Sequence, residues 1–258
     1  MSAIPLTPFL RWAPTTAHKG VLTGVDANQE WLLPLWLKAI KKHTSLPITF
    51  VDFGMSASAK AWCTKQGTLI SSLDETPFIK GKRSLCPILA KFWQRIYPGD
   101  VWKARSIWFK KPLALLKTPY EQTLWLDVDC QVRCDLAPVF APLEKGCGIA
   151  LCRTSPCYER SSQVVGLAHK EEKTFNSGVI TYKKGEKLIA TWAKLCLEKN
   201  EHFLGDENAL NRAIFQNQKG VFELPLKYNL PYFMQEEHEG AIIHYLSGRG
   251  KTLLLKSL

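Results

Sequence analysis

The chain contains 258 residues, of which 46% are hydrophobic and 22% are charged. This composition is ordinary for a folded protein and excludes a disordered chain. The longest stretch without Asp, Glu, Lys or Arg is residues 1–10, well short of the roughly 20 apolar residues that a membrane-spanning helix needs. The sequence therefore indicates a folded protein that does not cross a membrane, with a length that suits one large domain or two small ones.

The sequence carries 34 Lys and Arg residues against 23 Asp and Glu residues, for a formal net charge of +11. A surface of this charge can attract nucleic acid, anionic lipid or a phosphorylated small molecule. The positive residues are scattered singly and in short pairs, without a run of five or six and without a recognisable nucleic-acid motif. We therefore expect no nucleic-acid partner, and the charge alone does not define the function.

The first residues and the cysteines bear on the compartment. The amino-terminal segment has no cationic region followed by an apolar core, so it is not expected to be a secretory signal, and a cytoplasmic protein is expected. The eight cysteines should then be thiols rather than disulfides. Five of them fall between Cys130 and Cys157 without a Cys-x-x-Cys pair, which favours small buried side chains over a zinc–thiolate site.

Strand-like and helix-like patterns alternate along the chain, which is typical of an α/β layer fold. Short apolar runs predict strands, and apolar residues at three- and four-residue spacing predict helices. The expected strands cover residues 20–25, 47–51, 68–70, 123–126, 148–151, 177–182 and 241–243. The expected helices cover residues 31–43, 55–65, 88–96, 101–110, 186–199 and 206–218, and the rest of 71–98 is expected to form loops.

The apolar run over residues 123–126 ends in two acids, Asp127 and Asp129. Such a run is expected for a strand buried on both faces of a largely parallel sheet. Ligands of open α/β sheets bind beyond the carboxyl ends of the strands, where Asp26 and Asp52 also stand. Two carboxylates separated by one residue suit a Mg²⁺ or Mn²⁺ ion that holds a diphosphate.

The same acid pair occurs in haloacid-dehalogenase-type phosphatases, in which the first Asp is the nucleophile. In those enzymes the pair usually stands near the amino terminus, and a Thr or Val lies two residues after the second Asp. Here the pair is in the middle of the chain and Gln131 stands at that position, which argues against this class.

Taken together, six segments resemble the retaining GT-A glycosyltransferases of glycosyltransferase family 8, which include lipopolysaccharide galactosyl- and glucosyltransferases and glycogenin. The resemblance extends from about residue 20 to residue 251 and rests on short motifs. The segments are Asp26-Ala-Asn28, Leu124-Trp-Leu-Asp-Val-Asp129, Phe175-Asn-Ser-Gly-Val179, Gly205-Asp-Glu-Asn-Ala-Leu210, Lys227-Tyr-Asn229 and His244-Tyr-Leu-Ser-Gly248-Arg-Gly-Lys251. Two departures are that Gln29 replaces the family's aromatic residue, and that one extra residue separates His244 from Gly248.

The resemblance implies a single GT-A domain over residues 1–258, with a Rossmann-like, mostly parallel central sheet flanked by helices. Its nucleotide-binding half would cover about residues 19–135, and its donor-sugar and acceptor half about residues 136–258. It further implies a metal-dependent enzyme that moves a hexose from a nucleotide sugar, UDP-glucose or UDP-galactose, with retention of anomeric configuration. The acceptor would be an unknown glycan or glycolipid, by family analogy a bacterial surface glycolipid or lipopolysaccharide.

The resemblance also implies roles for individual residues. Asp127, Asp129 and His244 would bind the divalent cation, Mn²⁺ or Mg²⁺. Glu207, which takes the place of a family glutamine near the reacting carbon, and Asp206 would serve catalysis, although acids at a helix start are also explained by capping. The residues expected to bind the nucleotide or the donor sugar are Thr23, Asp26, Asn28, Lys110, Asp127, Val128, Asn176, Ser177, Gly178, Gly248 and Lys251.

Several alternatives stay open. Lys110 is the nearest match to the family's basic residue on the helix before the acids, with Lys103 and Arg105 as rivals. Gly178 would let the backbone approach the ligand closely, or would shape a turn into a strand. Two other functions fit the same residues: a metal-dependent nucleotidyltransferase or phosphatase, and a non-catalytic basic protein that binds nucleic acid or a membrane surface.

The carboxyl-terminal segment indicates a peripheral contact with an inner membrane. Lys251-Thr-Leu-Leu-Leu-Lys256 combines basic and apolar residues, a combination that binds anionic interfaces. The same residues are also explained as a final strand or helix turn packed on the core.

Overall fold

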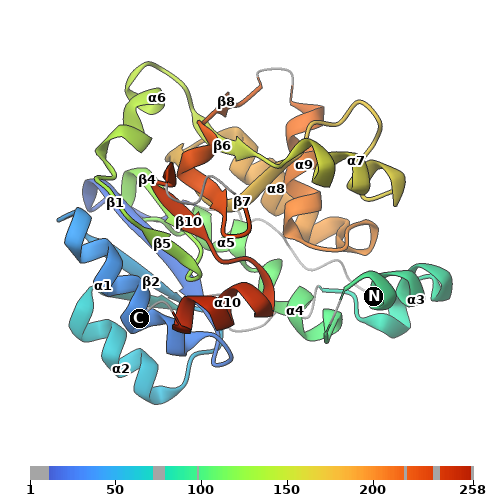
Figure 1. Ribbon diagram of the computed structural model, residues 1–258, viewed down its shortest axis with the longest axis horizontal. Helices are drawn as coiled ribbons and strands as arrows, with labels where there is room; N and C mark the ends of the chain where they lie inside the picture. Colours follow the sequence, from blue (N-terminus) through green and yellow to red (C-terminus); the bar gives the residue numbers. More distant parts are fainter. Residues whose placement is uncertain (1–11, 72–78, 98, 218–219, 235–238, 257–258) are drawn as a thin grey trace.

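The computed structural model describes residues 12–71, 79–97, 99–217, 220–234 and 239–256. The strands of these residues form a seven-stranded sheet and a three-stranded sheet (Figure 1). The large sheet contains β1 (Ala17–Val25), β2 (Ile48–Asp52), β3 (Thr68–Ser71), β4 (Tyr120–Leu126), β6 (Ile149–Arg153), β7 (Phe175–Lys183) and β8 (Phe222–Glu223). The small sheet contains β5 (Cys130–Val132), β9 (Leu230–Pro231) and β10 (Ile242–His244).

The helices that connect and cover these strands follow in chain order. They are α1 (Leu33–His43), α2 (Ala57–Gln66), α3 (Pro87–Ile96), α4 (Val101–Trp108), α5 (Lys111–Leu116), α6 (Ala141–Glu144), α7 (Pro156–Val164), α8 (Lys187–Glu198), α9 (Asp206–Gln216) and α10 (Ser247–Lys256). Short 3-10 turns are η1 (Glu30–Leu32), η2 (Lys82–Ser84), η3 (Ala137–Phe140), η4 (Asn200–His202) and η5 (Leu226–Asn229).

The large sheet has the strand order β3-β2-β1-β4-β7-β6-β8. The first four strands are mutually parallel, and β8 is parallel to β6, whereas β7 runs antiparallel to both of its neighbours. The mostly parallel central sheet flanked by helices, expected from the sequence, is therefore confirmed. The reversal at β7 matters for function because it brings the first residues of β7 to the carboxyl end of β4.

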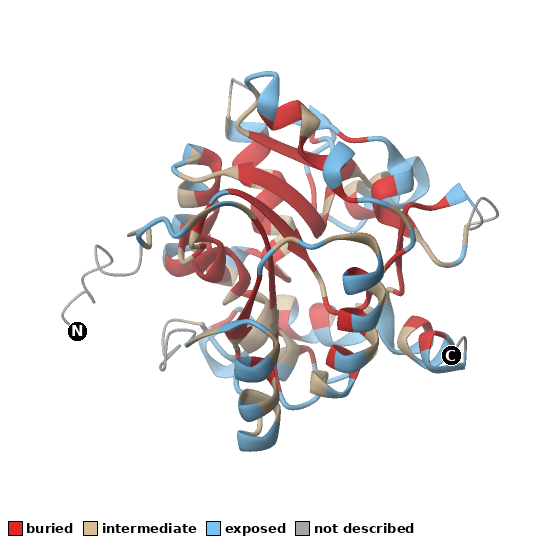
Figure 2. Cartoon of the chain, turned by 90° about the vertical axis from the view of Figure 1, so that its left-hand side faces the viewer, coloured by how far each residue is buried: buried red, intermediate tan, exposed pale blue. Residues whose placement is uncertain are grey.

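Two clusters of buried side chains cover the two faces of the large sheet. Consecutive residues of β4 alternate between them, with Leu124 and Leu126 in one cluster and Trp125 in the other, as a pleated strand requires. The first cluster also contains residues of α1, α2 and the small sheet, and the second contains residues of α5, α8 and α9. Figure 2 shows buried residues along the central strands and exposed residues on the outer sides of the helices. β4 is thus buried on both faces, as predicted.

The structure contains elements that the sequence patterns did not predict. β5, β9 and α6 span only two to four residues, too few to show a period. The expected helix over residues 101–110 ends at Trp108, and α5 begins at Lys111 with Pro112 in its first turn, where proline is tolerated. Residues 251–256 form the end of α10. Parts of the expected loop over 71–98 and the last residue of the expected helix 206–218 lie outside the described residues.

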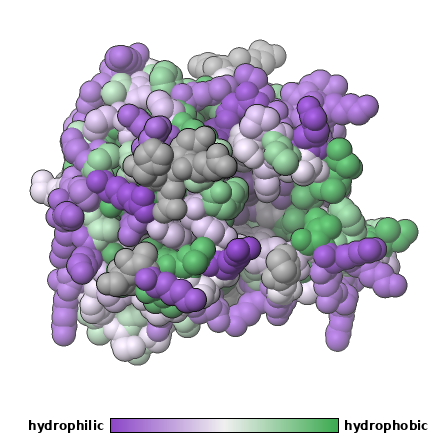
Figure 3. All heavy atoms as spheres, in the orientation of Figure 1, coloured by the Kyte–Doolittle hydropathy of each residue, from purple (hydrophilic) through white to green (hydrophobic). Residues whose placement is uncertain are grey.

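The surface and the cysteines add two observations. None of the helices in the described residues is long and apolar enough to span a bilayer. On the face seen in Figure 3, hydrophilic residues are spread over many places rather than gathered in one. The eight cysteines are free thiols, and the group of three metal-ligating side chains found among the described residues contains a single cysteine, Cys130.

Candidate active site

The polar residues of the candidate site come from elements that meet at the carboxyl end of β4. Because β4 and β7 are antiparallel, the N–H of Asp127 donates to the carbonyl of Gly178 at 2.8 Å, and the first residues of β7 lie beside the acids that follow β4. His244, at the end of β10, pairs with Cys130 of β5, which directly follows the acid turn. The chain thus brings three distant segments to one edge of the sheet.

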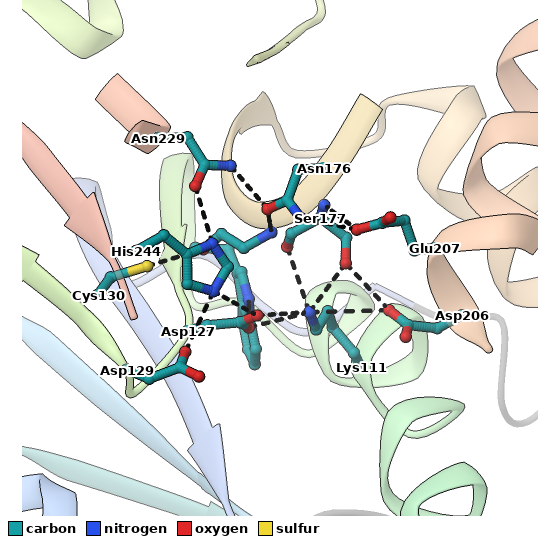
Figure 4. A network of polar contacts seen from close by, with 12 residues as sticks. Lys111, Asp127, Asp129, Cys130, Asn176, Ser177, Asp206, Glu207, Asn229 and His244 are labelled. Carbon is teal, nitrogen blue, oxygen red and sulfur yellow. Dashed lines mark hydrogen bonds and ion pairs between the residues drawn. The ribbon is translucent and has the colours of Figure 1, made fainter. Parts of the chain in front are cut away.

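Asp127, Asp129 and His244, the expected cation ligands, converge there (Figure 4). His244 Nε2 lies 3.2 Å from Asp129 Oδ1 and 3.9 Å from Asp127 Oδ2. Two ligands of one octahedral Mg²⁺ at ~2.1 Å lie about 3 Å apart when adjacent and about 4.2 Å apart when opposite. Both distances from His244 fall in this range, but the group whose ligand atoms all lie within 4.8 Å of one another contains Asp129 and His244 and not Asp127.

Cys130 lies close to the same group, with its sulfur within 4.8 Å of the ligand atoms of Asp129 and His244. Burial, followed by the negative charges of Asp129 and Asp127, raises the pKa of the Cys130 thiol well above its ordinary value. The protonated thiol donates to the carbonyl of Gly178 at 3.8 Å. A metal takes the thiolate rather than the thiol, so Cys130 is the least suited ligand of this group while it is protonated.

Two lysines hold the acids in place. Lys111 Nζ lies 2.9 Å from Asp127 Oδ1 and 3.7 Å from Asp206 Oδ2, and it donates to Ser177 Oγ at 3.1 Å. Burial alone would lower the pKa of Lys111, but the neighbouring carboxylates of Asp127 and Asp206 outweigh it and raise this pKa. Lys251 Nζ lies 3.2 Å from the second oxygen of Asp129.

The basic residue beside Asp127 and Asp206 is Lys111, the neighbour of the expected donor-binding residue Lys110. Lys110 Nζ donates to the carbonyl of Phe53 at 3.2 Å. Lys103, one of the rivals, donates to Asn28 Oδ1 at 2.9 Å and so reaches the end of β1 instead. The break between α4 and α5 explains the shift, because helical spacing does not carry across it.

Arg105, the other rival, holds the segment that leads into α9. Its buried guanidinium donates to three backbone carbonyls, those of Asn200, Phe203 and Leu204. The guanidinium carbon lies 4.6 Å from the ring centre of Trp93 and 4.8 Å from that of Phe109. Arg105 therefore anchors the residues just before Asp206.

Gly178 is required by the packing of His244. A Cβ atom on Gly178 would lie 2.1 Å from His244 Cε1 and 2.6 Å from His244 Nδ1, well inside van der Waals contact. The absence of a side chain at Gly178 thus lets the imidazole ring of His244 approach the backbone closely. The Gly178 N–H donates to Asn176 Oδ1 at 2.9 Å, which fixes the neighbouring side chain.

Glu207 stands at the start of α9, and its carboxylate is bound from outside that helix. Oε2 accepts from Asn176 Nδ2 at 2.8 Å and from the N–H of Ser177 at 3.2 Å. Oε1 accepts from the Tyr158 hydroxyl at 3.3 Å. The N-cap of α9 is Gly205, and all three donors belong to β7 or α7. These bonds tie the Glu207 carboxylate to β7 and α7 rather than to the N-cap of its own helix.

The environment raises the pKa of both acids of α9. Burial, together with the charge of Asp206, raises the pKa of Glu207 to about 7. Burial also raises the pKa of Asp206, against the opposing charge of Lys111. The charge of Glu207 and burial raise the pKa of Tyr158, so its hydroxyl stays protonated and can donate. Carboxyl groups perturbed in this way are concentrated at reactive sites.

The expected nucleotide-binding residues lie at the same edge of the sheet. Asp26 follows β1 as Asp127 follows β4, and these two strands are parallel neighbours. Thr23 Oγ1 and Asp26 Oδ1 are buried and have no hydrogen-bond partner among the described residues. Asn28 Nδ2 donates to the other oxygen of Asp26. Because buried polar atoms are normally paired, the two unpaired oxygens indicate a polar ligand here.

Three other positions have different surroundings. Asp52 Oδ1 accepts from the N–H groups of Gly54 and Met55, and its Oδ2 pairs with Lys60 at 2.6 Å, so this acid stabilises its own turn. The Val128 side chain packs in the first core cluster, so that a ligand would meet its backbone. Gly248 has no atom within 4 Å of its Cβ position, and the neighbouring Ser247 carries the positive φ of 66°.

Sequence reasoning assigned no role to three residues that contact the site. Lys111 was hidden by its similarity to Lys110, although two adjacent lysines before a proline are a visible signal. Asn229 belongs to a segment that the resemblance includes, but nothing in the sequence shows that it meets His244 Nδ1, at 2.9 Å. Tyr158 lies on α7, which was not predicted.

The fold and this site together define a class: the chain has the GT-A fold of glycosyltransferases, as the resemblance implied. The enzyme LgtC, solved as an active-site mutant in which glutamine is replaced by glutamate, matches with a TM-score of 0.61 at 17% identity, over 93% of this chain and 96% of LgtC. The bifunctional glycosyltransferase WbbM matches with a TM-score of 0.61 at 15% identity, over 92% of this chain and 47% of WbbM.

A third similar structure is the glycosyltransferase GlyE of Streptococcus pneumoniae TIGR4, with a TM-score of 0.55 at 18% identity, over 90% of this chain and 55% of GlyE. The chain thus spans about half the length of WbbM and GlyE, and nearly the whole length of LgtC. No protein-family model matches the sequence, and no curated protein sequence matches it.

Proposed function

We propose that the protein is a metal-dependent glycosyltransferase that moves a hexose from a nucleotide sugar to a glycan or glycolipid acceptor. The proposal rests on one observation, the convergence of Asp127, Asp129 and His244 at a strand end that also faces Glu207 across two asparagines. LgtC, which shares the fold, is a galactosyltransferase solved in complex with donor and acceptor sugar analogs, which supports this choice of reaction.

Breaking a sugar–phosphate bond builds negative charge on the departing nucleoside diphosphate. A divalent cation held by Asp127, Asp129 and His244 would stabilise that charge as a Lewis acid. The Lys251 side chain is 21% exposed, so its ammonium group can also turn to a diphosphate oxygen. The Lys111 side chain is only 9% exposed and is committed to carboxylates, so its role is to hold Asp127 and Asp206 in place.

Positive charge grows at the anomeric carbon in the same step, and Glu207 is the group placed to stabilise it. Its Oε2 is held by two donors, whereas its Oε1 has, among the described residues, the hydroxyl of Tyr158 alone, a residue that is 47% exposed. Oε1 is therefore the oxygen that a bound sugar would approach. We assign Asp206, beside it, to the hydroxyl groups of the donor sugar.

The two halves of the chain would bind different parts of the donor. In the half from about residue 19 to 135, the unpaired oxygens of Thr23 and Asp26 support nucleotide binding, together with Asn28. In the half from about residue 136 to 258, Asn176 and Ser177 contact Glu207 and would bind the sugar. We propose UDP-glucose or UDP-galactose as donor, with retention of configuration and a bacterial surface glycolipid as acceptor.

We further propose that the enzyme acts in the cytoplasm and touches an anionic membrane through α10. Leu253 and Leu255 are 39% and 49% exposed, while Leu254 between them is buried, and Lys256 follows. Apolar and basic side chains on one exposed helix end suit such an interface. Sedimentation with anionic vesicles should recover more protein than sedimentation with neutral vesicles, and equal recovery would refute the contact.

The reaction is tested by a thermal-shift screen of nucleotide sugars with and without Mn²⁺, followed by an assay of nucleoside diphosphate release. A UDP-hexose should raise the melting temperature only when Mn²⁺ is present, because the cation links the acids to the diphosphate. Asp129→Asn should abolish this dependence. Asp135→Asn, the same chemical change at an exposed acid beyond β5, should leave it intact.

Two results would contradict the proposal. If nucleotide sugars stabilise the protein equally with and without Mn²⁺, the proposed cation site is wrong. Release of phosphate or transfer of a nucleotidyl group, without sugar transfer, would favour the alternative of a nucleotidyltransferase or phosphatase that uses the same acids.

A further inference from the structure

A continuous line of side-chain hydrogen bonds joins Glu207 to His244 (Figure 4). Asn176 Nδ2 donates to Glu207 Oε2 at 2.8 Å, and Asn229 Nδ2 donates to Asn176 Oδ1 at 2.8 Å. Asn229 Oδ1 lies 2.9 Å from His244 Nδ1. These four residues come from α9, β7, η5 and β10, so the line ties together four segments that are far apart in the sequence.

The direction of every bond in this line is fixed by backbone groups and by a carboxylate. The N–H of Gly178 can only donate, so the atom of Asn176 that it meets at 2.9 Å is the oxygen. The amide nitrogen of Asn176 must then face Glu207, and the amide nitrogen of Asn229 must face the Asn176 oxygen. The oxygen of Asn229 is left for His244, so His244 Nδ1 carries the hydrogen.

This polarity decides what the other ring nitrogen can do. In the neutral imidazole one nitrogen donates and the other accepts, so a hydrogen on Nδ1 leaves the lone pair on Nε2. That is the nitrogen 3.2 Å from Asp129 and 3.9 Å from Asp127. His244 is 3% exposed and Asn229 is 3% exposed, so water does not offer an alternative partner to either. Packing against Gly178 holds the ring in the same orientation.

We infer that Asn229 is a positioning residue that, with Asn176, sets the metal ligand His244 and the carboxylate of Glu207 through one hydrogen-bond line. Asn229 keeps the hydrogen of His244 on Nδ1, so that Nε2 presents its lone pair between the two acids. Asn176 continues the hydrogen-bond line to Glu207 and donates to its Oε2, which leaves Oε1 for the sugar. This inference rests on the proposed function, because it takes His244 as a cation ligand.

An amide suits this position for a reason that separates it from other polar side chains. Position 229 must accept from His244 on one side and donate to Asn176 on the other, and a carboxylate can only accept. Asn229→Asp therefore keeps the bond to His244 but sets an oxygen against the oxygen of Asn176. Asn229→Leu, of similar size, removes both bonds. Asn229→Asp thus breaks the bond to Asn176 alone, whereas Asn229→Leu breaks the bonds to both Asn176 and His244.

The experiment measures Mn²⁺ affinity of the donor-free protein by electron paramagnetic resonance, and kcat with the donor. Asn229→Leu should weaken Mn²⁺ binding 10- to 100-fold, the usual loss when the partner of a ligating histidine is removed. Asn229→Asp should keep Mn²⁺ affinity within threefold of wild type while kcat falls at least tenfold, because only the branch to Glu207 is disturbed. Asn200→Leu, at another buried asparagine, should leave Mn²⁺ affinity unchanged.

The outcomes separate this inference from the proposed function. If His244→Ala binds Mn²⁺ as tightly as wild type, the cation site itself is wrong. If His244→Ala loses Mn²⁺ but Asn229→Leu does not, the site stands and the positioning role is refuted. Equal weakening in Asn229→Leu and Asn229→Asp would also refute it, because only Asn229→Asp keeps the bond to His244.

Discussion

Replacing Glu207 with glutamine should make the protein more stable and nearly inactive. The pKa of this carboxyl rises from an ordinary 4.5 to about 7, chiefly because burial disfavours its charged form. The folded pKa exceeds the unfolded one, so the ionised group costs stability. This cost appears as the pH rises from about 4.5 to about 7 and stays constant above that range.

The magnitude follows from the shift, since each pKa unit corresponds to about 1.36 kcal/mol. Linkage between pKa values of 4.5 and about 7 gives a difference of roughly 0.8 kcal/mol at pH 5 and about 3 kcal/mol at pH 8. Because Glu207 is partly exposed, solvent screening reduces the figure at pH 8 to about 2 kcal/mol. Glutamine adds no clash, since its oxygen can accept from Asn176 and Ser177 and its amide can donate to Tyr158.

Urea unfolding of wild type and Glu207→Gln at pH 5 and pH 8 measures this difference, with the half-exposed Glu198→Gln as a matched control that should change little. Turnover at pH 8 should fall about a hundredfold or more, on the order of 2.7 kcal/mol in the barrier. A variant that is less stable than wild type by about 0.3–1 kcal/mol at pH 8, with normal turnover, would refute the reasoning. It would show that Glu207 only complements the helix dipole.

Three further outcomes are expected. The wild-type kcat/KM should rise with pH up to about 7, as the Glu207 carboxyl ionises, and then level off. In the same pH series, the residual kcat/KM of Glu207→Gln should not show this rise. Lys111→Met should lower the free energy of unfolding by about 3–5 kcal/mol, because it leaves buried carboxylates unpaired, and a loss below 1 kcal/mol in urea titration would contradict the assignment. Arg105→Leu should cost at least about 3 kcal/mol by the same measurement, since three carbonyls lose a donor, whereas the more exposed Lys103→Ala should cost far less.

The sequence shows where polar residues follow apolar runs, and these positions lie at the ends of strands in the structure. Asp127 and Asp129 follow a run of apolar residues that is buried on both faces, where the crevice rule expects a ligand. His244 ends a short apolar run of the small sheet, whose residues pack in the first cluster alone. Asp52 meets the same criterion but is used by its own turn. A strand end therefore indicates an edge of the sheet, and the local hydrogen bonds decide whether the acid is free for a ligand.

The remaining features depend on contacts between distant segments. Lys111 rather than Lys110 meets the acids because the helix is interrupted before Pro112, and no periodicity fixes the rotation of the next helix. Gly178 serves the packing of a ring that lies 66 positions further along the chain. The small sheet that carries His244 is built from strands of two or three residues, which are too short to be recognised before the large sheet is known.

The antiparallel pairing of β4 and β7 has a consequence for how such a protein can diversify. The chain leaves the acid turn after Asp129 and returns at Asn176, and the bond between Asp127 and Gly178 closes the base of this excursion. Insertions or deletions in the loops of this excursion do not change the spacing between the acids and the first residues of β7, whereas its strands β5 and β6 are fixed by their pairing with β10 and β7. Yet the excursion carries α7, whose Tyr158 touches the exposed oxygen of Glu207. The residues that contact the Glu207 carboxylate can therefore differ between related proteins while the residues at the cation site stay the same.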